Sequence, residues 1–156
     1  MNKDIQEIQL VCFRLDRNLY AADIMRVKEI VKPQQLAGLP HAPAFVAGVI
    51  NLRGTVIPVL DLHKRFNLPS PVADKKNRLL IVSLSGQTYG LAVDEVSEVI
   101  SVPVQDLRPP PHFDAGVDAE YLIAVCLAKG TLLMLLNLDK IMRGQEASEE
   151  LLISSQ

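Results

Sequence analysis

Three histidines and one Asp-x-His pair are the residues that could support catalysis or metal binding. The histidines are His41, His63 and His112, and none pairs with another histidine or with a cysteine at zinc-ligand spacing. Asp61-Leu62-His63 could form half of an acid–base dyad, but no nucleophile lies near it in the sequence. The chain also has no nucleophile elbow, P-loop, zinc-protease or dinucleotide-binding motif. The sequence therefore predicts no catalytic, cofactor-binding or metal-binding site, and His63 is interpreted as a surface or helix-start residue.

The two cysteines predict packing rather than chemistry. Cys12 and Cys126 both lie inside apolar runs. Free cysteine is among the most buried residue types. We expect both thiols to be buried and unpaired.

A cation at a tight turn is the most promising binding feature. Arg53-Gly54 and Lys129-Gly130 each join two apolar runs, and a glycine in second place suits a two-residue hairpin with positive φ. The run 48–62 is strongly apolar around Arg53. Arg53 is therefore either a solvated hairpin tip or a guanidinium offered to a partner between apolar walls.

Short apolar runs separated by Gly, Pro, Asn and Asp predict the elements that must position these residues, and they indicate an all-β fold. The expected strands are 9–16, 19–23, 28–32, 46–52, 55–61, 78–84, 87–93, 97–102, 121–128 and 131–138. Short helical turns are expected at 23–26, 61–66, 93–96 and 139–143. Pro58 lies inside an expected strand and indicates an edge strand or a bulge there.

The chain contains an internal repeat. Residues 10–31 align with 79–100 at five identical positions, among them Tyr20 with Tyr89. Residues 54–66 align with 130–142, again at five identical positions. Each copy is expected to form a small closed or half-closed barrel of five strands, and the two barrels are expected to pack on each other.

The repeat sets the expected boundaries. The chain is expected to form a single domain over 1–156, with one subdomain at about 9–70, a second at about 78–143, and a link near 69–77. The tail 144–156 is expected to hold an amphipathic helix at 147–153. Asp61 and Asn137 are repeat equivalents that precede a helical turn, so both are expected to cap it.

The composition argues against two classes of partner. A formal net charge of -2 gives no general reason to bind nucleic acid. Aromatic residues are only 4%, too few for base-stacking platforms, so Phe13, Phe45, Phe66 and Phe113 are expected in the core. The N-terminus does not resemble a signal peptide, and no apolar run reaches membrane-spanning length. We expect a cytoplasmic protein without membrane insertion, and a small-barrel nucleic-acid binder stays as an alternative.

Two segments resemble the CheW family of chemotaxis adaptors. They are Tyr20-Ala21-Ala22-Asp23-Ile24-Met25-Arg26-Val27-Lys28-Glu29-Ile30-Val31 and the proline-bounded run from Leu39 to Leu62, which contains Asn51-Leu52-Arg53-Gly54. The resemblance covers about residues 9–143. It implies two packed five-stranded SH3-like barrels and a non-enzymatic scaffold that couples methyl-accepting chemoreceptors to the histidine kinase CheA.

The resemblance also implies where the receptors bind. The cytoplasmic tip of the receptors would bind in a groove between the barrels, at Val27, Glu29 and Arg53, with Val11, Ile24 and Val96 lining the apolar part. The resemblance does not identify the kinase-binding residues, and we expect the kinase's regulatory domain to bind first-barrel loop ends, including part of 36–45 around Leu39. The scaffold would then be recruited to membrane-associated receptor arrays. An adaptor of the same fold in a non-flagellar pathway, such as surface motility or second-messenger control, stays as an alternative.

Overall fold

The computed structural model describes residues 6–110 and 119–142, and the elements agree closely with the expected ones. The strands are β1 (Glu7–Leu15), β2 (Asn18–Asp23), β3 (Val27–Val31), β4 (Val46–Leu52), β5 (Thr55–Asp61), β6 (Arg78–Leu84), β7 (Gln87–Val93), β8 (Glu95–Pro103), β9 (Leu122–Ala128) and β10 (Thr131–Leu136). The helical turns are η1 (Ile24–Arg26), α1 (Leu62–Arg65), η2 (Val104–Asp106), η3 (Ala119–Tyr121) and α2 (Leu138–Ile141). The all-β prediction is confirmed. The tail 144–156, His112 and Phe113 lie outside the described residues.

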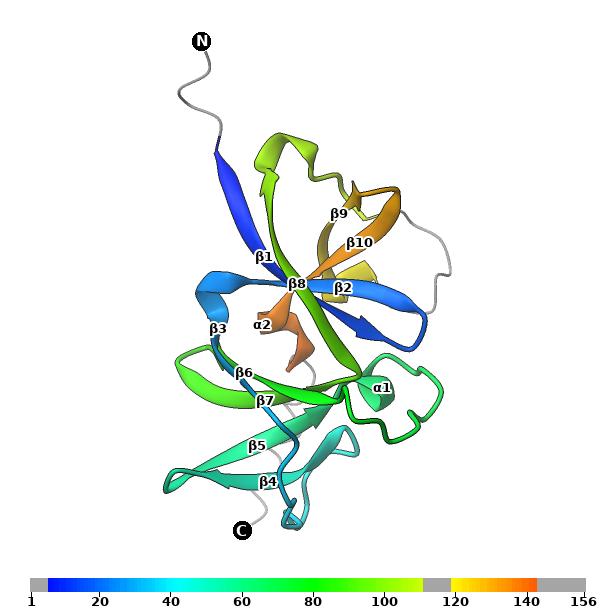
Figure 1. Ribbon diagram of the computed structural model, residues 1–156. Helices are drawn as coiled ribbons and strands as arrows, with labels where there is room; N and C mark the ends of the chain where they lie inside the picture. The colour runs from blue at the N-terminus through cyan, green and yellow to red at the C-terminus, as the bar shows by residue number, and fades with distance from the viewer. Residues whose placement is uncertain (1–5, 111–118, 143–156) are drawn as a thin grey trace.

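The strands form two five-stranded sheets, one above the other in Figure 1. The upper sheet has the order β8-β1-β2-β10-β9, and the lower sheet has the order β3-β6-β7-β5-β4. Most neighbours are antiparallel, but β10 pairs with β2 and β5 pairs with β7 in parallel. The order places a pair of parallel strands at the same position in each sheet, which is consistent with the sequence repeat.

Each sheet is built from both repeats, which differs from the expectation that each repeat makes its own barrel. The upper sheet takes β1 and β2 from the first repeat and β8–β10 from the second, while the lower sheet takes β3–β5 and β6–β7. The chain passes between the sheets at η1 and again at Asp94. The expected subdomains 9–70 and 78–143 therefore describe the sequence repeat and not the spatial units.

One isolated bridge closes each sheet into a barrel. Ala37, beyond β3, pairs with Val49 in β4, and Arg108, beyond β8, pairs with Val125 in β9. Val49 and Val125 are repeat equivalents. We call the upper unit barrel A and the lower unit barrel B. Closure leaves few unpaired strand edges, which is how small barrels avoid edge-to-edge aggregation.

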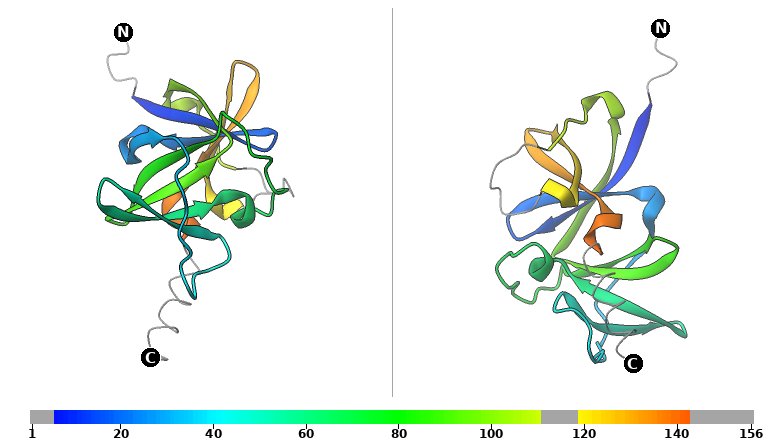
Figure 2. Two further views of the ribbon diagram at one scale, coloured as in Figure 1. Left: turned by 60° about the horizontal axis from the view of Figure 1, so that its bottom comes forward. Right: turned by 180° about the vertical axis from the view of Figure 1, so that it is seen from behind.

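A shared core joins the two barrels. The largest buried cluster takes side chains from strands of both barrels and from α1 and α2, which lie at the junction between them (Figure 2). Its centre is a row of rings, with Phe13 to Tyr20 centroids 6.2 Å apart and Tyr20 to Phe66 centroids 6.0 Å apart. The expected core positions of Phe13, Phe45 and Phe66 are confirmed.

The helix caps were predicted correctly, whereas two backbone features were not. The Asp61 carboxylate accepts from Lys64 N at 3.2 Å, and the Asn137 side chain accepts from Lys140 N at 3.4 Å, so both residues cap their helices. The expected helical turn at 93–96 is instead the passage into β8. Pro58 is on an interior strand of its sheet, not an edge strand, and a register shift in the β4–β5 ladder lies close by, between Val46 and Gly48 of β4. Its missing N–H is tolerated because the ladder between β5 and β7 begins only at Val59.

Candidate functional site

The two hairpin-tip cations are each held by a carboxylate of the same barrel. Arg53 and Lys129 have φ of 51° and 52°, and each precedes a glycine with positive φ, which confirms the predicted turn type. Arg53 Nη2 forms an ion pair with Glu29 of β3, and Lys129 Nζ lies 3.3 Å from the Glu98 carboxylate of β8. The structure thus brings together Glu29 and Arg53, which lie 24 positions apart in the sequence.

The Arg53–Glu29 pair lies at the surface. The Arg53 side chain is 67% exposed, and the Glu29 side chain is half-buried. Pairing holds the guanidinium in one place while leaving most of it in contact with solvent. Arginine presents five donors, so the pair can bind a further carboxylate or carbonyl without breaking.

The apolar residues predicted beside this pair lie against the core that the two barrels share, at what we call the seam. Ile24, Val27 and Val96 are partly buried and pack against the shared core. A hollow of about 280 Å³ lies between β3 and β8, lined in part by Ile30 and Val96. Val11 differs, because it is only 2% exposed. It supports the seam from beneath and does not form a wall of an open groove.

An ion pair anchors the first passage between the barrels. Arg26 of η1 binds the Asp139 carboxylate of α2 through both terminal nitrogens, at 2.6 and 3.0 Å, and donates to Ser83 O at 3.0 Å. The hydrogen bond to Asp139 raises the pKa of the Arg26 guanidinium above its ordinary value. The contact fixes η1, from which Val27 and the seam begin.

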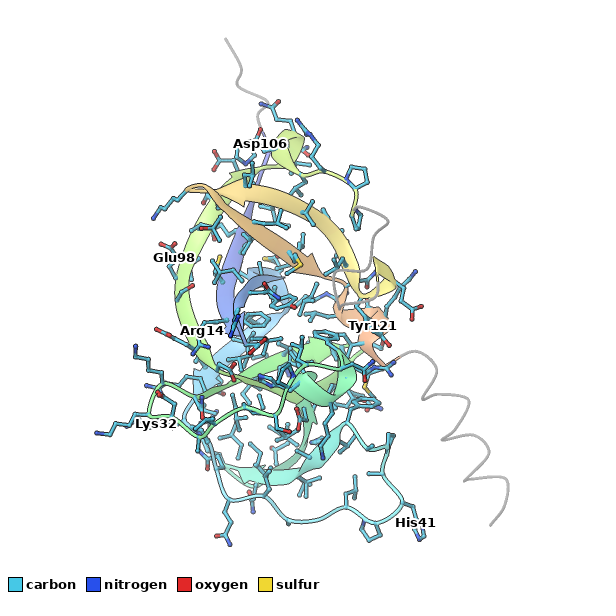
Figure 3. The ribbon with its side chains drawn as sticks, turned by 90° about the vertical axis from the view of Figure 1, so that its right-hand side faces the viewer. Arg14, Lys32, His41, Glu98, Asp106 and Tyr121 are labelled. Carbon is cyan, nitrogen blue, oxygen red and sulfur yellow. The ribbon has the colours of Figure 1, made fainter. Side chains whose placement is uncertain are left out.

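A buried polar pair anchors the second passage. The His63 ring of α1 is almost fully buried and lies 3.1 Å from Asp94 Oδ2. The same oxygen accepts from Asp16 N at 2.7 Å and lies 3.6 Å from Arg14 Nη1. Arg14 is at the junction of the two sheets (Figure 3).

His63 begins a helix as expected, but it is not at the surface. It aligns with Asp139 in the repeat. The second residue of each helix therefore anchors one of the two segments where the chain crosses between the barrels. The partner Asp94 was missed because no sequence pattern pointed to it. The alignment of His63 with Asp139 was the one signal that could have indicated an anchoring role for His63.

The described residues offer little for catalysis. They contain no group of three or more His, Cys, Asp and Glu side chains that could hold a metal ion. His41 is at the tip of the β3–β4 connection, away from both barrels (Figure 3). Both cysteines are free and buried, as predicted. Burial raises the pKa of Cys12 to about 11 and also raises the pKa of Cys126, so both thiols stay protonated near neutral pH and are poor nucleophiles.

Comparisons with known proteins agree with this geometry. The family described as CheW-like domain matches residues 9–146. The chain is 37% identical to the chemotaxis protein CheW of Treponema pallidum over 145 residues, covering 90% of this chain and 85% of that protein. It is 30% identical to CheW of Rhizobium meliloti, covering 88% and 89%. The crystal structure of the scaffolding protein TtCheW from Thermoanaerobacter tengcongensis superposes with a TM-score of 0.83 at 33% identity, covering 92% of each chain.

The fold is a double barrel. Its distinctive features are the Arg53–Glu29 pair at the surface and the apolar residues at the seam, which suit contact with other proteins. The chain belongs to the CheW family of chemotaxis scaffold proteins. No helix among the described residues is long and apolar enough to cross a membrane.

Proposed function

We propose that this chain couples methyl-accepting chemoreceptors to the histidine kinase CheA by binding both, without catalysis of its own. It would do so in the cytoplasm, at membrane-associated receptor arrays. The observation that carries the proposal is the exposed Arg53 guanidinium, which is paired with Glu29, two residues along β3 from Val27, and Val27 packs against the core that both barrels share. Membership of the CheW family supports it.

The receptor tip would bind at the seam. Val27 and Val96 offer apolar surface to side chains of a helical partner. The Arg53–Glu29 pair would fix the partner's orientation, because charged groups at an interface contribute more to specificity than to affinity. Val27, Glu29, Arg53, Ile24 and Val96 therefore remain the proposed receptor-binding residues, with Val11 in a supporting role.

The kinase would bind the β3–β4 connection. Leu36 and Leu39 are exposed large apolar residues on that connection. They lie in the loop 36–45 that precedes β4, on barrel B. Exposed leucines on one loop are a fitting contact for a second small barrel, so this loop remains the proposed kinase-binding region.

Reversing the charge of Arg53 should separate receptor binding from folding. We expect Arg53→Glu to weaken binding of a receptor-hairpin fragment by about tenfold or more, which is ~1.4 kcal/mol, because it repels Glu29 and removes the guanidinium. The residue is exposed, so the free energy of unfolding should change by less than about 1 kcal/mol. Isothermal titration calorimetry and urea unfolding measure the two effects.

Lys129→Glu is the matched control. It places the same charge reversal beside Glu98 at the equivalent turn of barrel A. We expect receptor affinity to stay within about twofold of the unmodified protein. Equal loss of affinity in the two variants, or no loss in Arg53→Glu, would place the receptor site elsewhere.

A further inference from the structure

The two barrels fill their interiors differently at equivalent positions. The second core cluster, inside barrel A, includes Leu135 and has Ile8 packed against it. The aligned residues of barrel B are Val59 and Asn77. Ala21 of barrel A likewise aligns with Gly90 of barrel B. Barrel B therefore has less apolar volume at one end than its repeat partner.

The missing volume coincides with a cavity. A cavity of about 320 Å³ lies at this end of barrel B, between β5, β6, β7 and the connections that carry Leu36 and Val72. Val59, Leu79 and Ala92 contribute apolar lining, and Ala47 lines it from an exposed position. The volume is at the lower end of the range for small-molecule pockets.

Two carboxylates, Asp61 and Asp94, and the Arg78 guanidinium line the cavity. Arg78 donates to the carbonyls of Lys75 and Asn77, and Asn77 Nδ2 donates to Asp94 O, at 2.7 to 3.0 Å. By contrast, Asp61 uses only Oδ1, and Asp94 uses only Oδ2, in the contacts recorded among the described residues. Each carboxylate accepts about four hydrogen bonds when ionised. Among the described residues, Asp61 and Asp94 therefore each keep one oxygen for a ligand, and Arg78 keeps its Nε and Nη2 donors.

We propose that this end of barrel B is a binding pocket for a small organic cation, with an apolar body and a protonated amine. The body would lie against Val59 and Ala92, and Asp61 would accept from the amine. A buried charge is tolerated only when it is paired and hydrogen-bonded, which the free Asp61 oxygen provides. The proposal does not depend on the proposed function.

Three variants test the proposal, and each copies the aligned residue of barrel A. Val59→Leu and Ala47→Ile reproduce Leu135 and Ile123, and both reduce the cavity volume. Asp61→Asn reproduces Asn137, so it keeps a residue that caps α1 while removing the charge. Ala47 is exposed, so Ala47→Ile keeps the test available if Val59→Leu folds poorly.

The probe is 2-phenylethylamine, with 3-phenylpropionate as the matched anion, titrated into the full chain by calorimetry. We expect one saturable amine site per chain with a Kd below about 1 mM, and much weaker binding of the anion. Val59→Leu or Ala47→Ile should weaken the amine about tenfold, and Asp61→Asn about fivefold. The melting temperature of each unliganded variant reports its folding.

The proposal is overturned by any of three results. The first is no saturable amine binding. The second is binding that persists at full strength in both folded cavity-filling variants. The third is equal affinity for the amine and the anion, since that would remove the role of Asp61.

Discussion

Cutting the chain between residues 72 and 73 is expected to give two fragments that do not fold as monomers and that fold together when mixed. Fragment 1–72 keeps only β1 and β2 of barrel A. In barrel B it lacks β6 and β7, which lie between β3 and β5. Fragment 73–156 lacks β1 and β2 of barrel A and β3, β4 and β5 of barrel B. Because neither fragment can bury the shared core, neither can offset the entropy of ordering its chain.

Far-UV circular dichroism of each fragment and of their 1:1 mixture measures this effect. The control is a cleavable site inserted after Val72, which is 86% exposed in the connection before β6. Protein cut after folding should keep its sheet signal, because the break removes no strand. A fragment that folds alone as a monomer would contradict the strand exchange between repeats.

Gly48→Ala should destabilise the protein by about 2 kcal/mol or more. Gly48 has φ of 151°, and a Cβ placed there would lie 2.6 Å from the carbonyl oxygen of Ala37. That oxygen accepts from Val49 N at 2.8 Å in the bridge that closes barrel B. A backbone atom cannot move aside cheaply, so the closing bridge should be lost or strained.

Gly38→Ala is the control for that substitution. No atom lies within 4 Å of a Cβ built on Gly38, and its φ is not in the left-handed region. Its stability in urea unfolding should stay within about 0.5 kcal/mol of the unmodified protein. Equal stability of the two alanine variants would show that barrel B does not need the close approach at Gly48.

The strands and hairpins were predictable because their signals are local. Alternating apolar runs and the Arg53-Gly54 and Lys129-Gly130 turns fix strand ends to within one or two residues at most positions. The caps at Asp61 and Asn137 follow from a side chain and a backbone N–H three residues apart. The alignment of the two repeats added the equivalence of Glu29 with Glu98.

The assembly of the strands was not predictable in the same way. An internal repeat indicates that two units of sequence have similar structures. It is equally compatible with strands that pair within a unit and with strands that are exchanged between units. The pairing of β2 with β10 joins residues more than 110 positions apart, and no local pattern encodes it. The burial of His63 against Asp94 depends on the same exchange, since it needs α1 beside the passage from β7 to β8.

Part of the candidate site likewise could not be predicted from the sequence. Arg53 and Glu29 could each be singled out, but their ion pair depends on barrel closure, which brings the β4–β5 turn beside β3. Val11 was expected at the groove because the resemblance to the CheW family implied it. Its place under the seam depends on which face of β1 meets the shared core.

Retention of CheA on immobilised receptor tests the scaffold account most directly. A receptor-hairpin fragment is fixed to beads, the kinase's regulatory domain is added, and bound kinase is measured with and without this chain. We expect kinase to be retained when the chain is present, Arg53→Glu to abolish most of the retention, and Lys129→Glu to leave it intact. Kinase retention that is equal with and without the chain would contradict it.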